Sequence, residues 1–279
     1  MQEGIGETPI FLVFIPFGLA IYAAFTNTAT IEQAKQTMTE QKKIIEEQKE
    51  IIDSINYAKR LQNALPPSIE LINSNLPHNF IYYQPKDIVA ADCTGHGVPG
   101  AMVSVMCSGA LTRTINELHI TQPHLILSKT RELILETFAK NNEEVKDGMD
   151  ISLLCIDKKN KIAFWSGANN PLWYLQNKKV VEIKPDKQPI GKTDKPLPFT
   201  THKIDFNEET TFYLFNDGLP DQFGGLKGKK YKYKQMQELL LQNCHLSLNE
   251  QKQKLHKSFM DWKGKLEQVD DVCVMGIRV

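Results

Sequence analysis

The pattern of hydrophobic and polar residues divides the chain into three parts. The first part, residues 1–31, contains an uncharged stretch over residues 8–31, of which 10–25 read IFLVFIPFGLAIYAAF. This stretch is close to the length that crosses a bilayer and predicts a transmembrane helix; a buried hydrophobic helix is the alternative. Because the first basic residue is Lys35, the positive-inside rule predicts a single-pass protein of the inner (cytoplasmic) membrane, with its C-terminal domain in the cytoplasm.

The second part, residues 32–67, is rich in Lys, Glu and Gln and carries an apolar repeat. Apolar side chains recur every seven residues, at Ile44, Ile51, Ala58 and Leu65. This is the spacing of a coiled-coil seam and predicts a linker helix, which Pro66 and Pro67 end because proline removes a helical N–H donor. One interpretation is a parallel homodimer formed through residues 38–65. The other is a single amphipathic helix that packs on its own domain.

The third part, residues 68–279, contains both helical and strand-like patterns. Strands are expected at 80–83 and 88–91, and helices from Pro99 to about residue 118 and from Pro123 to about residue 139. After residue 150 come short β-type runs: ISLLCI, KIAFWS, PLWYL, VVEI and TFYLF. Helices at 233–243 and 247–262 and a strand at 272–277 complete the pattern. Because helices and strands are grouped rather than alternating, we expect an α+β fold, an antiparallel β-sandwich flanked by helices.

Charge and cysteine content exclude several classes of protein. Lys+Arg and Asp+Glu number 33 each, so the overall charge does not favour nucleic-acid binding. The five cysteines are widely spaced and form no C-x-x-C, which argues against a zinc ribbon or a disulfide framework. Any bound metal is therefore expected to have mainly oxygen ligands.

A glycine-rich turn lies between a predicted strand and a predicted helix. Residues 90–102 read AADCTGHGVPGAM, in which Gly95, Gly97 and Gly100 satisfy G-x-G-x-x-G. A dinucleotide site is rejected, because the helix here leads into a second helix instead of a parallel strand, and Asp92 would place a negative charge beside the pyrophosphate. The glycines instead indicate a tight turn.

Aspartates recur at the ends of apolar strands. Asp92 precedes the glycine turn, Asp217 follows TFYLF, and Asp270 and Asp271 come just before the last strand. A carboxylate buried at a strand end needs a cation or several hydrogen bonds. Each aspartate taken alone is better explained as a turn residue, but together they favour a hard divalent ion such as Mg²⁺ or Mn²⁺.

The order of these motifs resembles a known family. DCTGHGVPGA, DGMDISLLCID, SGANNPLW, DKQPIG, NDGLPDQFGG and DDVCVMGI are similar, as an ordered set, to the SpoIIE-like branch of the metal-dependent PPM (protein phosphatase 2C-like) serine/threonine phosphatases. The resemblance covers residues 54–279, because SINYAKRLQNALPP resembles the helix that often precedes this domain in bacterial sensor proteins.

The resemblance implies roles for individual residues. Asp92, with the backbone carbonyl of Cys93, is implied to bind a two-metal centre of Mn²⁺ or Mg²⁺; Asp217 and Asp270 complete it, with Asp271 as the substitute for Asp270. A metal-activated water would then hydrolyse a phosphorylated regulatory protein. Two alternatives are considered for each of three other residues. His96 either acts as a proton donor or organises its turn. Asp147 and Asp150 either support the metal ligands or form a helix-to-strand turn, and the pattern favours the turn.

One departure from the family pattern concerns the centre itself. In this branch Pro-Lys-Asp-Ile-Val continues into Ser-Gly-Asp-Phe, whose aspartate bridges both metals, whereas here Val89 is followed directly by Ala90. The missing segment amounts to about 20 residues, or two strands and a turn. Asp87 matches a different position and does not replace the bridge. A degenerate phosphatase, a natural deletion with a regulatory binding role and a defect in the recorded sequence are the three explanations, and the alternative function is a catalytically impaired binding module that dimerises through its heptad helix.

Overall fold

The computed structural model describes residues 32–33, 35–46, 48–49, 52–53, 79–84, 92–94, 97–139 and 147–279. Contacts between residues divide the chain into a unit of residues 1–54 and a larger unit of residues 55–279. In the first unit residues 35–46 are helical, and Ile44 and Ile45 are exposed. The remaining heptad positions and the apolar segment at 8–31 lie outside the described residues. Among the residues that are described, no helix is long and apolar enough to cross a membrane.

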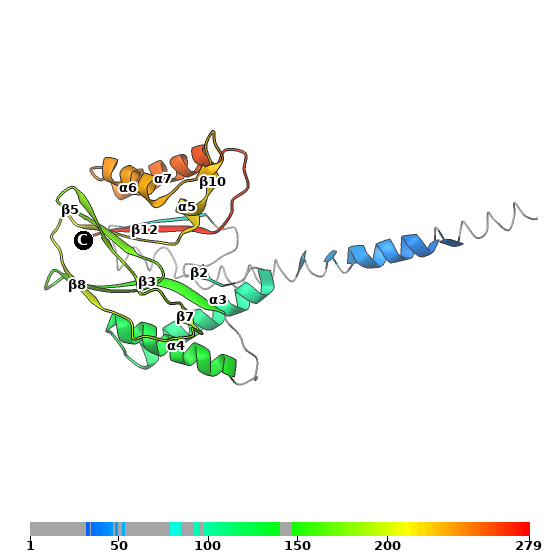
Figure 1. Ribbon diagram of the computed structural model, residues 1–279, viewed down its shortest axis with the longest axis horizontal. Coiled ribbons are helices and arrows are strands. Elements are labelled where there is room, and N and C mark those ends of the chain that lie inside the picture. Colours follow the sequence, from blue (N-terminus) through cyan, green and yellow to red (C-terminus); the bar gives the residue numbers. More distant parts are fainter. Residues whose placement is uncertain are drawn as a thin grey trace, which may run out of the picture. The chain divides into compact units, whose positions relative to one another are not determined.

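Two antiparallel sheets form the larger unit (Figure 1). The first sheet has the order β1 (Asn79–Gln84), β12 (Val272–Arg278), β9 (Thr211–Phe215), β5 (Leu172–Gln176) and β6 (Lys179–Ile183). The second has the order β2 (Asp92–Cys93), β3 (Gly148–Asp157), β4 (Ile162–Ala168) and β8 (His202–Asp205), with β7 (Ile190–Gly191) also paired to β3. A separate hairpin joins β10 (Phe223–Gly224) to β11 (Lys229–Lys230).

Helices cover the outer faces of both sheets. The pair α6 (Tyr233–Gln242) and α7 (Leu248–Lys263) packs on the first sheet, and α3 (Gly97–Thr112) and α4 (Pro123–Ala139) pack on the second (Figure 1). A short π-helix, η1 (Arg113–Glu117), continues α3, where the sequence predicted a single helix to about residue 118. The helix–sheet–sheet–helix arrangement confirms the predicted α+β fold with antiparallel sheets flanked by helices.

The hydrophobic core lies in three layers that follow this arrangement. The middle layer, between the sheets, contains Trp165 and Phe212, while Trp173 belongs to the layer between the first sheet and α6–α7. Both tryptophans are fully buried, and each indole N–H has a partner: Trp165 donates to Ser152 Oγ at 2.8 Å and Trp173 to Glu182 Oε2 at 3.1 Å. Buried aromatic rings of this size contribute strongly to stability, so the sandwich is held from both faces.

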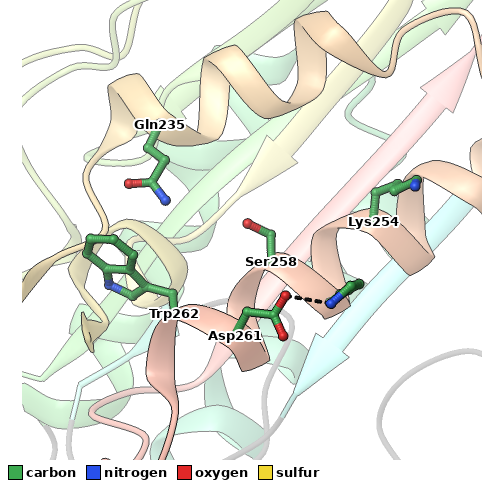
Figure 2. A pocket seen from close by; sticks show the side chains of 6 residues that line it. Gln235, Lys254, Ser258, Asp261 and Trp262 are labelled. Carbon is green, nitrogen blue, oxygen red and sulfur yellow. Dashed lines mark hydrogen bonds and ion pairs between the residues drawn. The ribbon is translucent and has the colours of Figure 1, made fainter. Parts of the chain in front are cut away.

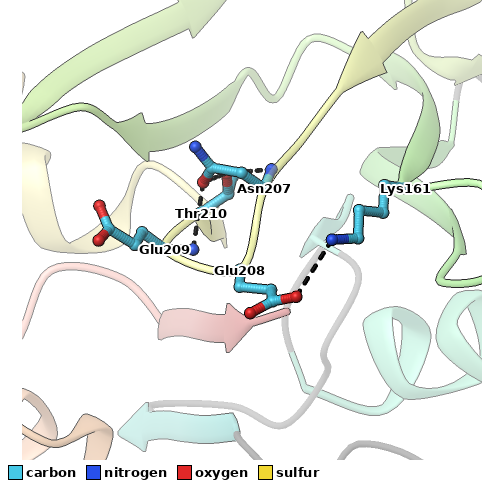
Figure 3. A network of polar contacts seen from close by, with 5 residues as sticks. All are labelled: Lys161, Asn207, Glu208, Glu209 and Thr210. Carbon is cyan, nitrogen blue, oxygen red and sulfur yellow. Dashed lines mark hydrogen bonds and ion pairs between the residues drawn. The ribbon is translucent and has the colours of Figure 1, made fainter.

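The chain passes from the second sheet to the first through a polar turn between β8 and β9 (Figure 3). Asn207 Oδ1 accepts hydrogen bonds from the Glu209 N–H and from Thr210 Oγ1, at 3.1 and 3.0 Å. Side-chain-to-backbone bonds of this type stabilise turns. The ion pair of Glu208 with Lys161 at 3.1 Å is exposed and contributes little. The turn starts β9 at Thr211, and β9 leads into the aspartate turn at residue 217.

A capping box begins α7 and offers a test of this part of the fold. Ser247 Oγ accepts from the Glu250 N–H at 3.3 Å, and the Glu250 carboxylate accepts from the Ser247 N–H at 2.9 Å. We expect Ser247→Ala to lower the free energy of unfolding by about 1 kcal/mol, measured by urea denaturation. A hydrogen bond from the Ser247 hydroxyl to Glu250 Oε2 at 2.7 Å, followed by the one from the Ser247 N–H, holds the pKa of Glu250 below its ordinary value of 4.5. The stabilisation that the Glu250 carboxylate contributes is therefore fully present above pH 4.5 and is lost as the pH falls through the lowered pKa. If the loss of unfolding free energy in Ser247→Ala became larger on acidification, the capping-box assignment would be contradicted.

Candidate metal centre

The Asp217 turn follows β9 directly and is tied to the start of β12. The buried Asn216 donates from Nδ2 to the Asp271 carbonyl at 2.7 Å and accepts at Oδ1 from the Cys273 N–H at 2.9 Å. The Asn216 N–H donates to the Cys273 carbonyl at 3.2 Å. One side chain therefore holds two strand ends together, and it places the Asp217 turn beside Asp271.

Glycine is required at the next position because the two backbones nearly touch. A Cβ atom built on Gly218 would lie 1.8 Å from the Asp271 carbonyl oxygen. Asp217 then opens α5 (Gly218–Asp221), and its carbonyl accepts the Asp221 N–H at 2.9 Å. Oδ1 of Asp217 is buried. The turn thus presents a carboxylate just after the end of β9, the middle strand of the first sheet, and backbone contacts hold it there.

The second sheet contributes two aspartates, on the neighbouring strands β2 and β3. In β2, Asp92 lies directly opposite Asp150 of β3, and Cys93 lies opposite Met149. The Thr94 N–H donates to the Gly148 carbonyl at 3.0 Å. Residues along an antiparallel strand alternately point their backbone N–H and C=O groups toward and away from the neighbouring strand. Since the Thr94 N–H points toward β3, the Cys93 carbonyl of the same peptide group points away from it. The structure describes the backbone of Asp92 and not its side chain.

Cys93 and Asp147 are placed by contacts with their neighbours. The Cys93 side chain packs against the core beneath α3, and its hydrogen bond with Cys107, together with burial, raises the pKa of the Cys107 thiol. Thr94 Oγ1 donates to Asp147 Oδ1 at 2.9 Å, which fixes the start of β3. Cys93 is therefore suited to offer its carbonyl oxygen rather than its thiol to an ion.

Asp150 connects the two sheets electrostatically. Burial raises the pKa of its carboxyl, the hydrogen bond from Asn169 Nδ2 at 2.8 Å lowers it, and the negative charge of Asp217 raises it. Asp150 and Asn216 also line one cavity of about 80 Å³ between the sheets. Asp150 of the second sheet therefore lies within electrostatic reach of Asp217, which follows the first sheet, although the two are far apart in the sequence.

The predicted site residues differ in how the structure places them. Asp270 is exposed, and its Oδ1 accepts the Asp271 N–H at 2.7 Å, whereas Asp271 is half-buried next to Gly218. The preferred turn role of Asp150 is wrong, because Asp150 is the third residue of β3. Asn216, which the sequence reasoning missed, could have been suspected from its place between an apolar strand and Asp-Gly. His96, Asp87 and the junction of Val89 with Ala90 lie outside the described residues.

The chemistry of the donor set fits a divalent cation. Asp150 and Asp217 are oxygen donors whose negative charges oppose each other, and a hard cation between carboxylates removes that repulsion. Among the side chains that the structure describes, which do not include that of Asp92, no three of His, Cys, Asp or Glu converge closely enough to hold an ion. The assignments of Asp92, Cys93, Asp217, Asp270 and Asp271 as metal ligands therefore stay predictions.

Comparisons with known proteins agree with this geometry. The family described as Stage II sporulation protein E (SpoIIE) matches residues 87–279. The SiaA-PP2C domain of Pseudomonas aeruginosa superposes with a TM-score of 0.74 and 26% identity, over 83% of this chain and 98% of that one. The search of curated proteins finds no match.

Two further structures share the fold at lower identity. The PP2C phosphatase domain with a regulatory fragment of SpoIIE from Bacillus subtilis has a TM-score of 0.53 and 13% identity, over 73% of this chain and 59% of that one. The RsbU and RsbW domains of a Mycobacterium tuberculosis protein have a TM-score of 0.55 and 16% identity, over 73% of this chain and 60% of that one. With a family match over most of its length and a PP2C-type fold, the chain belongs to the SpoIIE family of PP2C-type phosphatase domains.

Proposed function

We propose that the chain is a Mg²⁺- or Mn²⁺-dependent phosphoserine/phosphothreonine protein phosphatase of a bacterial signalling pathway, acting on a phosphorylated regulatory protein. The observation that carries the proposal is that Asp150 of the second sheet and Asn216, which precedes Asp217, line one cavity, while Asp271 lies against Gly218. Family membership over residues 87–279 supports it. The PP2C-type relatives contribute the reaction class.

The residues of the chain have separate tasks in this proposal. Asp92, Asp217 and Asp270 would hold the ions, with the Cys93 carbonyl and Asp271 as further oxygen donors. When bound, the metal supplies a water of lowered pKa for attack on phosphorus and offsets charge on the phosphoryl oxygens. Asn216 keeps the two strand ends in place through its bonds to Asp271 and Cys273, and Asp150 adds negative charge that favours cation binding.

Chelation tests the proposal directly. The full chain should release phosphate from a phosphoserine peptide when Mn²⁺ is added, and EDTA should abolish the release until Mn²⁺ is restored. Phosphate release is measured with a malachite-green assay. Hydrolysis that EDTA leaves unchanged, in a preparation shown to be free of contaminating phosphatase, would exclude a metal-dependent reaction.

A second candidate is a catalytically impaired regulatory binding module. It is favoured by the departure between Val89 and Ala90 and by one feature of the second sheet. β2 pairs with only two residues of β3, Met149 and Asp150. On that side of β3, no described strand pairs with residues 151–157. This candidate predicts no turnover, and partner binding that survives Asp92→Asn and Asp217→Asn. Resequencing the source DNA across codons 85–95 decides whether the bridging aspartate was ever lost.

The N-terminal part gives the proposal its cellular setting. We propose a single-pass inner-membrane location through residues 8–31 and a homodimer through residues 38–65, both from the sequence pattern. Alkaline carbonate extraction of membranes tests the first, because a spanning chain stays in the pellet. Cross-linking of Ile44→Cys tests the second, because a parallel seam places this residue beside its copy.

A further inference from the structure

A dense group of positive charges lies just after the Asp217 turn. Residues 222–234 contain five lysines and no acidic residue, in a chain whose net charge is zero. They form the hairpin of β10 and β11 and the start of α6. We call residues 223–232 the lysine hairpin. Lysine side chains do not bind a metal cation, so the candidate metal centre does not account for this local excess of positive charge.

The base of the lysine hairpin packs against the end of α7, and its charged side chains are exposed. The Gly225 N–H donates to the Trp262 carbonyl at 2.8 Å, and a Cβ atom on Gly224 would lie 1.9 Å from the same oxygen. The strands are therefore pressed against the end of α7. Gly225 and Gly228, with φ of 64° and 56°, close the turn. Its tip exposes Leu226 and Lys227 to solvent.

The lysine hairpin is joined to the aspartate turn by short contacts. Lys230 Nζ pairs with Asp221 Oδ2 at 2.8 Å, and the Asp221 N–H in turn donates to the Asp217 carbonyl at 2.9 Å. The Lys232 N–H donates to the Pro220 carbonyl at 2.7 Å. Tyr233, the first residue of α6, is also influenced by the aspartates. Partial burial of the phenol raises its pKa to about 12, and the charges of Asp217, Asp221 and Glu182 contribute to the rise. Asp221, one helical turn after Asp217, thus links the aspartate turn to Lys230 of the hairpin.

Several of these lysines are available for a partner. Among the described residues, Lys227, Lys229 and Lys232 are exposed and form no ion pair. The groove between α6 and α7, of about 410 Å³, differs (Figure 2). There Lys257 is paired with Asp261 at 2.7 Å, and Ser258 Oγ shares a hydrogen bond with the Tyr231 hydroxyl at 2.7 Å. Lys254, which also lines the groove, is exposed and has no ion pair among the described residues, so the groove carries one unpaired lysine whereas the hairpin carries three.

We propose that the lysine hairpin binds an acidic segment that flanks the phosphorylated residue of the substrate protein. The inference rests on the proposed function, since it assigns the hairpin to the substrate of that same site. Exposed lysines attract carboxylates through a screened, nonspecific field, and the exposed Phe223 and Leu226 add apolar contact area beside them. The hairpin would select acidic substrates while the aspartate site holds the phosphoryl group.

Binding measurements test the inference without any turnover. The full chain, kept soluble in amphipol and with EDTA present, is titrated into two fluorescein-labelled phosphoserine peptides, one with Asp/Glu flanks and one with Asn/Gln flanks. Anisotropy should show about tenfold tighter binding of the acidic peptide at low salt, a preference that high salt reduces. Lys227→Glu/Lys229→Glu should abolish this preference, and Lys227→Gln/Lys229→Gln should remove part of it.

A matched variant controls for net charge. Lys178→Glu/Lys179→Glu makes the same charge change at the β5–β6 turn and the first residue of β6. This hairpin lies at the end of the sheet away from Asp217, because Leu172 pairs with Leu214 and Leu175 with Thr211. It should keep the preference. The inference is overturned if the wild type binds both peptides equally, if the control variant loses the preference as fully, or if the hairpin instead mediates binding to phosphatidylserine vesicles without any peptide preference. If the wild type binds the acidic peptide more tightly but hydrolyses no phosphopeptide with Mn²⁺ present, the result counts against the proposed function and not against this inference.

Discussion

Asp217→Asn should abolish metal-dependent hydrolysis of a phosphopeptide, lowering kcat/KM by about 10³-fold. The carboxylate lies where β9 ends, beside Asp271 and within electrostatic reach of Asp150. Asparagine keeps the size and the hydrogen-bonding oxygen but removes the negative charge that a cation needs. The fold should survive, because the turn is held by Asn216 and by backbone bonds. Phosphate release and Mn²⁺ affinity by calorimetry are the two measurements.

The control for this substitution is Asp205→Asn, which removes an exposed carboxylate of β8 whose only described partner is Lys203 at 3.7 Å. It should leave both hydrolysis and Mn²⁺ binding at the wild-type level. If Asp217→Asn retained full activity and full Mn²⁺ affinity, Asp217 could not be a metal ligand. The candidate centre would then have to be sought elsewhere in the chain.

Gly218→Ala should damage both the stability and the site. The new Cβ atom would lie 1.8 Å from the Asp271 carbonyl oxygen and 2.7 Å from its carbon, and these are backbone atoms that cannot rotate away. Overpacking of this kind costs about 1–3 kcal/mol, which lowers Tm by roughly 2–12 °C in a domain of this size. Because relief requires β12 to move away from the Asp217 turn, Mn²⁺ affinity should fall even well below Tm.

Gly109→Ala provides the matched comparison. Gly109 lies inside α3, and a Cβ atom there would meet no atom within 4 Å. The same substitution should therefore stabilise the domain by about 0.5–1 kcal/mol through better helix propensity. Both variants are followed by thermal unfolding and Mn²⁺ titration. An unchanged Tm and unchanged Mn²⁺ affinity in Gly218→Ala would contradict the close approach of the two strand ends.

Where long stretches have a regular pattern, the sequence predicted the elements well. α4 runs from Pro123 to Ala139 and β9 from Thr211 to Phe215, as expected from the apolar spacing. β2, β7, β10 and β11 have two residues each. Two residues carry no readable period, and such strands exist only because a neighbouring strand pairs with them. β7, β10 and β11 were therefore missed, whereas β2, which carries Asp92, directly follows the strand expected at 88–91, whose residues lie outside those described.

By itself the sequence determined the fold class, the family and the presence of aspartates at strand ends, because apolar periodicity and ordered motifs are local properties of the chain. Only the tertiary structure decided which of those aspartates meet. Asp150 looked like a turn residue until its strand was placed opposite β2, and Asn216 had no evident role until β12 lay beside it. The same is true of the lysine hairpin, whose distance from Asp217 depends on α5 and α7. Such contacts join residues far apart along the chain, and a local pattern of residues carries no record of them.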